Sequence, residues 1–270
     1  MTAGIDLNMD SRPNPGGEGS GLGFVTLEQE RTIEQLPLTG SLPPWLRGSL
    51  LRTGPARFEV GGQSMRHWFD GLAMLHRFTI TDGRVSYGNR FLESRSYKAA
   101  REQGRMVYGE FATDPCRSLF KRVQTLFSPG SVLPDNANIN ITRLGERFIA
   151  MTETPLPSIN YGRCNERPYR YVWGNGNGED GWLEQILKID TTDGATLSWS
   201  QPGCYPGEPV FVARPEAEDE DDGVLLSVVL DAEAETSFLL VLDAADLSEL
   251  ARAQAPHHIP FGFHGQFAWA

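Results

Sequence analysis

Short runs of alternating apolar and polar residues recur along this chain, and they come in pairs. Asp- and Gly-containing turns such as Thr81-Asp-Gly83 separate the two runs of a pair. β-Branched and aromatic residues on both sides of such a turn are typical of β-hairpins. The sequence therefore predicts four hairpins: Leu72–Ile80 with Arg84–Leu92, Ala137–Arg143 with Arg147–Thr152, Trp182–Ile189 with Ala195–Trp199, and Val224–Leu230 with Ser237–Leu242.

Helical patterns are scarce by comparison. Only Asp243–Ala253 and Pro115–Thr125 have the composition of a helix, and both segments are short. Repeated hairpins with so little helix predict an all-β fold, namely a sandwich, a barrel or a propeller. The hairpins share a pattern but not a sequence, so the pattern alone leaves these three architectures open.

Composition and charge narrow the function classes. The chain has 24 basic and 35 acidic residues in 270, a formal net charge of −11. This balance argues against nucleic-acid binding through a basic face. The longest apolar stretch, Val224–Leu230, is too short to cross a bilayer. The first ten residues carry two acids and no base, which is unlike a signal peptide, so we expect a cytoplasmic protein.

Two segments have loop composition. The Pro- and Gly-rich run from Arg12 to Gly23 predicts a flexible leader over residues 1–24. The acidic run Glu216–Asp222 predicts a solvated loop that tolerates neutralisation. The three cysteines form no CxxC pair, so neither a zinc knuckle nor a disulfide framework is indicated.

The five histidines are the candidates for metal or acid–base chemistry. His76 lies within a predicted strand, where a packed structural role is expected. His257 and His258 are neighbours that would point in opposite directions on an extended chain. The six residues from His258 to His264 would span roughly 20 Å when extended. The spacing of the five histidines, His67 included, does not define a metal site. The sequence also has no phosphate-binding loop and no nucleophile motif.

Longer segments of the sequence carry a family resemblance that the spacing of single residues does not show. In chain order, eight segments resemble the carotenoid cleavage oxygenase family, in its branch of animal carotene oxygenases and the retinoid isomerase, and they cover nearly the whole chain after residue 25. They are Leu42–Phe58, His67–His76, Tyr87–Phe91, Met151–Thr154, Ile159–Tyr161, Arg167–Gly174, Tyr205–Val212 and Phe261–Phe267.

The resemblance implies a seven-bladed β-propeller with a non-haem Fe(II) ion that four neutral histidines hold on the propeller axis. Imidazole suits ferrous iron, and open coordination positions allow O₂ to be activated. The implied reaction is O₂-dependent oxidative cleavage of a carotenoid double bond, with β-carotene giving retinal. The implied partners are the carotenoid or another apolar polyene and O₂, with contact at a membrane surface.

Residue by residue, the resemblance assigns His264 as an iron ligand and Glu208 as the carboxylate that orients it. Glu153 matches a carboxylate that would orient another ligand. The motifs that carry the family's other three histidines are absent from this chain. The sequence thus resembles a family member with a large internal deletion, in which an N-terminal propeller part (25–157) is joined to a C-terminal part (158–270) and the propeller is incomplete. No catalytic or substrate-binding residue is assigned.

Two functions follow from this comparison. One is a carotenoid dioxygenase, with an intact paralogue supplying the missing histidines. The other is a catalytically inactive propeller remnant that binds an apolar ligand or a partner. Iron content and retinal formation distinguish them.

Overall fold

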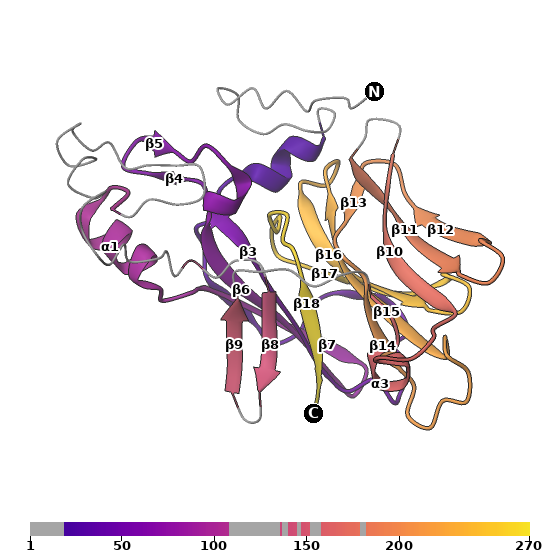
Figure 1. The fold of residues 1–270 in the computed structure, drawn as a ribbon. Helices are drawn as coiled ribbons and strands as arrows, with labels where there is room; N and C mark the ends of the chain where they lie inside the picture. Colours follow the sequence, from indigo (N-terminus) through magenta and orange to yellow (C-terminus); the bar gives the residue numbers. More distant parts are fainter. Residues whose placement is uncertain (1–18, 108–135, 137–139, 145–146, 152–157, 179–181) are drawn as a thin grey trace, which may run out of the picture.

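The fold is built almost entirely from antiparallel strands in the computed structural model, which describes residues 19–107, 136, 140–144, 147–151, 158–178 and 182–270 (Figure 1). The all-β prediction is confirmed. All four predicted hairpins are present, as the pairs β6–β7, β8–β9, β11–β12 and β15–β16. Among the described helices, none has the length and hydrophobicity that a bilayer crossing requires.

The elements have the following bounds in chain order: the 3-10 helix η1 Ser20–Phe24, β1 Arg31–Ile33, β2 Leu38–Gly40, β3 Gly48–Arg57, β4 Glu59–Val60, β5 Gln63–Ser64, the 3-10 helix η2 Trp68–Asp70, β6 Leu72–Thr81, β7 Arg84–Phe91, α1 Arg95–Gln103, β8 Asn140–Leu144, β9 Arg147–Met151, α3 Tyr161–Cys164, β10 Tyr171–Asn177, β11 Leu183–Asp190, β12 Thr196–Ser200, β13 Cys204–Pro206, β14 Val210–Ala213, β15 Gly223–Asp231, β16 Thr236–Asp243, β17 Glu249–Gln254 and β18 Gly265–Trp269.

Two large sheets combine strands from both halves of the chain. The five-stranded sheet has the order β1-β7-β6-β3-β18, so the last strand pairs with β3. The six-stranded sheet has the order β13-β15-β16-β17-β2, with β14 also paired to β15. A strand from the N-terminal part of the chain, β2, thus joins a sheet whose other strands come from the C-terminal part. The smaller sheets are β10-β11-β12, β4-β5 and β8-β9. No sheet formed by the described strands closes on itself.

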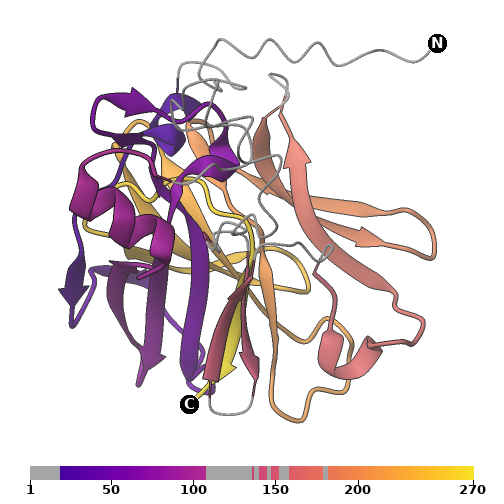
Figure 2. The same ribbon diagram turned by 60° about the vertical axis from the view of Figure 1, so that its left-hand side comes forward.

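The six-stranded sheet is buried on both faces, which explains the unbroken apolar run in β15. Leu226 and Val228 face a core shared with the five-stranded sheet. Leu225 and Val229 face a second core shared with β10 and β11. Successive side chains of a strand point to opposite faces, so a central strand between two cores must be apolar throughout. In both views the six-stranded sheet lies between the five-stranded sheet and β10–β12 (Figure 2).

Helix α1 was not predicted from the sequence. Its N-cap Ser94 accepts a hydrogen bond from the Tyr97 N–H at 3.0 Å, and Gly104 ends it in the left-handed region at φ 61°. Tyr97 stacks on Phe91 with ring centroids 4.8 Å apart, which fixes the helix against β7. The helix belongs to a local core outside the two large ones.

The helix predicted at Asp243–Ala253 is wrong. Leu247 has φ 60° in a turn, and the chain then forms β17. In β17, Ala251 and Ala253 are buried and alternate with less buried neighbours, as in a strand paired on β16. The alanines gave this segment a helical composition, but packing on β16 determined its structure. The other predicted helix, Pro115–Thr125, lies outside the described residues.

The predicted flexible leader differs from the structure at its end. Residues 1–18 lie outside the described residues, whereas Ser20–Phe24 form η1. Ser20 is fully buried, and a Cβ added at Gly23 would come within 2.2 Å of the Phe261 ring. This turn of helix is therefore packed against the C-terminal part of the chain.

Candidate functional site

A histidine–carboxylate pair joins the two large sheets. Glu208 lies between β13 and β14, and His264 immediately precedes β18. His264 Nδ1 and Glu208 Oε1 are 2.9 Å apart, and both side chains are about one-fifth exposed. The structure therefore brings together the two residues that the sequence comparison had paired. Their roles toward iron are not tested by this contact and stay predictions.

The contact defines which imidazole nitrogen is available to a ligand. An ionised carboxylate only accepts hydrogen bonds, so the Nδ1–H of His264 donates to Glu208. In the neutral imidazole the other nitrogen, Nε2, then carries the lone pair. This is the arrangement in which a carboxylate orients a metal-binding histidine.

The backbone next to Glu208 is held by side chains from other strands. Asn175 Nδ2 on β10 donates to the Pro206 and Gly207 carbonyls, at 3.0 and 3.2 Å. Ser227 Oγ on β15 donates to the Gly207 carbonyl at 2.7 Å. These bonds fix the segment that carries the carboxylate.

The other four histidines, all within the described residues, have different partners. His76 Nδ1 lies 2.8 Å from the Tyr87 hydroxyl, which is 3.5 Å from His257 Nε2. His258 Nε2 lies 3.3 Å from the Val25 carbonyl. His67 caps η2 by accepting from the Phe69 N–H at 3.1 Å. The structural role expected for His76 is confirmed.

These positions do not fit a four-histidine iron site. Within the part of the chain that the structure describes, no three His, Cys, Asp or Glu side chains are grouped so that they could hold a metal ion. Glu153, the other predicted carboxylate, lies outside the described residues. One imidazole and the carboxylate bonded to it would be too few donors to hold Fe(II) against water.

An aromatic cluster, which the sequence analysis did not identify, borders the pair. The ring of Phe263, next to His264, lies 4.3 Å from Trp68 between centroids. Trp68 Nε1 donates to the Phe261 carbonyl at 3.0 Å, and Phe24 and Trp182 pack against the same rings. The adjacent aromatic residues Trp68 and Phe69 were a visible signal, but nothing in the sequence placed them beside residues 261–263.

The buried His76 predicts a pH dependence of stability. Burial lowers the pKa of His76 to about 3, and His257 and Arg52 add to the shift. A histidine whose folded pKa lies below its unfolded value of about 6.5 stabilises the fold above that value, and the stability is lost as the pH falls toward 3. We expect His76 to contribute a decrease of about 1.4 kcal/mol per pH unit in the free energy of unfolding below pH 6.5.

Urea unfolding between pH 4.5 and 7.5 measures this slope. His76→Gln keeps a hydrogen-bonding partner for Tyr87 but does not titrate, so its unfolding free energy should depend less steeply on pH than that of the wild type. His257 and His258, whose pKa values burial also lowers, remain in both proteins and cancel in the comparison. Parallel curves would contradict a neutral buried His76.

Solved structures with a similar fold show which type of fold this chain has. A mutant of the Synechocystis apocarotenoid oxygenase matches with a TM-score of 0.85 at 18% identity, over 95% of this chain and 99% of that chain. The cobalt-substituted form of that protein matches with a TM-score of 0.81 at 19% identity, over the same shares. The fold is therefore a β-propeller of this type, and it is incomplete in the present chain.

The family follows from the sequence comparison. The sequence model described as retinal pigment epithelial membrane protein matches residues 24–159 and 154–268. The chain belongs to this family, the carotenoid oxygenases, as the resemblance had implied. The two matched segments overlap at residues 154–159, and the junction expected after residue 157 falls within this overlap.

Curated relatives are similar over part of the chain. The carotenoid isomerooxygenase of Galleria mellonella is 46% identical over 143 residues, 51% of this chain and 28% of its own length. The β,β-carotene 15,15'-dioxygenase of Rattus norvegicus is 46% identical over 124 residues, 43% and 22% of the two lengths. The mitochondrial carotenoid-cleaving dioxygenase of Homo sapiens is 41% identical over 136 residues, 46% and 24%. The chain thus spans about a quarter of the length of these relatives.

Proposed function

We propose that this carotenoid oxygenase-like chain contributes His264, oriented by Glu208, to an iron site that cleaves a carotenoid double bond with O₂. The reaction we infer is β-carotene to retinal, by analogy with the named activities of the relatives. The observation that carries the proposal is the 2.9 Å contact between His264 Nδ1 and Glu208 Oε1, which leaves Nε2 free.

The histidines that complete such a site are not provided by the described residues. All five histidines lie among those residues, and four of them have other partners. An intact paralogue is the source that we propose for the missing histidines. Association with such a paralogue is therefore part of the proposal, as are an apolar polyene substrate, contact with a membrane surface and a cytoplasmic location.

Iron content tests this proposal. The purified chain alone should contain far less than one iron per molecule and form no retinal from β-carotene in detergent under O₂. Mixed with a full-length relative in which the histidine that matches His264 is replaced, it should co-purify as a complex whose iron requires His264. In that complex, Glu208→Gln should weaken iron binding about 10–100-fold, because carboxylates that orient metal-bound histidines have effects of this size.

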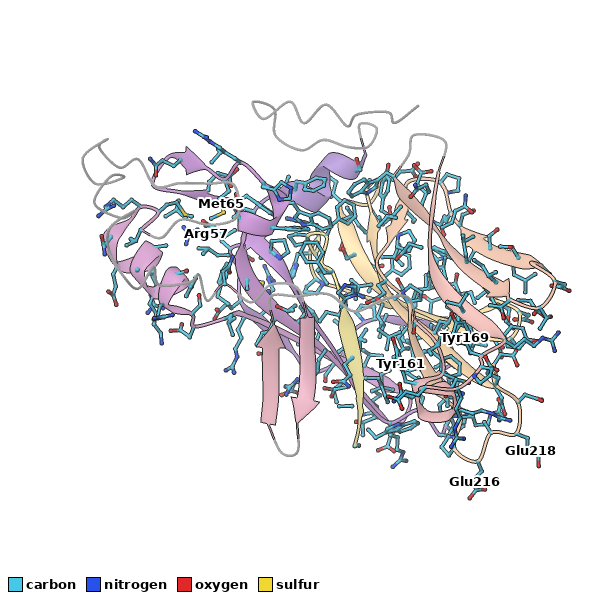
Figure 3. The ribbon with its side chains drawn as sticks, viewed as in Figure 1. Arg57, Met65, Tyr161, Tyr169, Glu216 and Glu218 are labelled. Atoms are coloured by element: carbon cyan, nitrogen blue, oxygen red, sulfur yellow. The ribbon has the colours of Figure 1, made fainter. Side chains whose placement is uncertain are left out.

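Glu218→Gln is the matched control, since that carboxylate is exposed in the loop between β14 and β15 (Figure 3), whereas Glu208 lies between β13 and β14. It should leave iron content unchanged. Stoichiometric iron and retinal formation by the chain alone would contradict the need for a second chain. Failure to form any complex would contradict the shared site.

A second candidate is a catalytically inactive remnant that binds an apolar ligand or a partner. The incomplete donor set among the described residues favours it. Under this alternative, His264→Ala and Glu208→Gln change neither the iron content nor the stability of the chain, alone or mixed with a relative.

A further inference from the structure

Arg52 on β3 links the two backbones that carry the Glu208–His264 pair. Its side chain is buried, with the residue 4% exposed. Nη1 donates to the Glu208 carbonyl at 2.9 Å, and Nη2 donates to the Phe263 carbonyl at 2.8 Å. One planar guanidinium therefore binds the residue that bears the carboxylate and the residue before the histidine.

Two glycines leave space for the Arg52 side chain. A Cβ at Gly207 would lie 3.2 Å from Arg52 Nη2, and a Cβ at Gly265 would lie 2.8 Å from Arg52 Cγ. Gly207 directly precedes Glu208, and Gly265 directly follows His264. The residues beside the pair thus accommodate an arginine at this position. Lysine has a single ammonium nitrogen, so it lacks the two-nitrogen fork with which Arg52 bonds both carbonyls.

Burying this cation has a cost. Burial lowers the pKa of Arg52, and the charge of Glu208 partly offsets the effect. A buried charge is tolerated when it is paired and hydrogen-bonded, which is the role that the two carbonyls and the nearby carboxylate fulfil. The environment of Arg52 is therefore coupled to Glu208 both through the backbone and through charge.

We propose that Arg52 is a positioning residue that fixes the Glu208 and His264 backbones relative to each other and so holds the carboxylate on Nδ1. This inference rests on the proposed function for its biological meaning. Its physical content is the orientation of His264, which can be measured without iron.

The test is the tautomer of His264, read from ¹⁵N NMR of the imidazole in the metal-free chain at one fixed pH for all variants. The wild type should populate the Nδ1–H form. In Arg52→Lys and Arg52→Gln, the ratio of Nδ1–H to Nε2–H should fall about fivefold or more, since a hydrogen bond to a charged group contributes at least this factor.

Asn89→Ala is the matched control. It removes a buried side chain on β7 that hydrogen-bonds the Arg31 N–H and the Gln29 carbonyl, so it should lower stability, but it bonds neither the Glu208 nor the Phe263 segment and should leave the tautomer ratio unchanged. An unchanged ratio in a folded Arg52 variant would overturn the proposal. If the Arg52 variants do not fold, the wild type decides: resolved Nη resonances with restricted rotation support the clamp, and averaged ones overturn it.

The outcome is separable from that of the proposed function. A tautomer shift in Arg52→Lys together with no iron in any complex supports the positioning role and contradicts the shared iron site. An iron-containing complex together with an unchanged tautomer ratio in Arg52→Lys supports the shared iron site and contradicts the positioning role.

Discussion

Asp221→Asn is expected to lower the free energy of unfolding by about 3–5 kcal/mol, the usual cost of breaking a buried ion pair. Lys188 on β11 is 5% exposed and forms an ion pair with Asp221, whose side chain is 17% exposed. Lys188 also donates to the Ala245 carbonyl at 2.7 Å, and its Nζ lies 4.1 Å from the centroid of the Tyr171 ring. Removing the carboxylate leaves a buried ammonium without a compensating charge.

Urea denaturation at pH 7 measures this change. The double variant Lys188→Met/Asp221→Asn should recover most of the loss, because no unpaired charge remains in the interior. Glu216→Gln and Glu218→Gln, which neutralise exposed acids in the same loop, should change stability by no more than about 0.5 kcal/mol (Figure 3). Equal effects of all three single neutralisations would show that the Lys188 pair has no special weight.

Trp173→Ala is expected to cost about 3–5 kcal/mol, the range for truncating a fully buried large side chain. Trp173 on β10 is completely buried. It stacks on Phe211 of β14 with centroids 4.5 Å apart, and its Nε1 donates to the Ala244 carbonyl at 3.3 Å. The side chain is thus a main attachment of the three-stranded sheet to the six-stranded one.

Thermal and urea unfolding of Trp173→Ala and Leu197→Ala provide the comparison. Leu197 lies on the exposed edge strand β12 and is 47% exposed, so its truncation should have an effect within about 0.5 kcal/mol. A similar small loss for Trp173→Ala would mean that the three-stranded sheet contributes little to the cooperative unit.

The hairpins could be predicted because their information is local. Leu72–Ile80 and its partner are joined by a two-residue turn in which Asp82 and Gly83 have positive φ, as an Asp-Gly pair favours. The partner of β3 could not be predicted in this way. The pairing of Leu50 with Phe267 depends on a strand from the other end of the chain, for which no turn signal exists.

The acidic run shows where charge patterning fails. The sequence predicted a solvated loop, and Glu216 and Glu218 are indeed exposed. Glu220, however, accepts hydrogen bonds from the Arg170 and Tyr171 N–H groups at 2.9 and 2.8 Å, and Asp221 pairs with Lys188. The expectation of a wholly solvated run is therefore wrong for these two acids, since a list of like charges does not show which of them meet a partner. The tolerance of the run to neutralisation stays a prediction, and we no longer expect it for Asp221.

The site was predictable only through family resemblance. Spacing gave no reason to pair Glu208 with His264, which lie next to strands of different sheets. Arg52 could not be predicted as a site residue either, because the two carbonyls that it binds are remote in sequence. Contacts between backbone carbonyls and a distant side chain leave no pattern in the sequence.

The exchange of strands between the two large sheets has a consequence for how this chain folds during synthesis. Strands β2 and β3 are synthesised well before their partners β17 and β18. Hairpins such as β6–β7 can form at once, whereas β2 and β3 must wait for β17 and β18 before these pairings form. Such non-local pairing is slow and leaves strand edges open to aggregation in the interval, so we expect nascent chains to be most prone to aggregation before β17 and β18 are made.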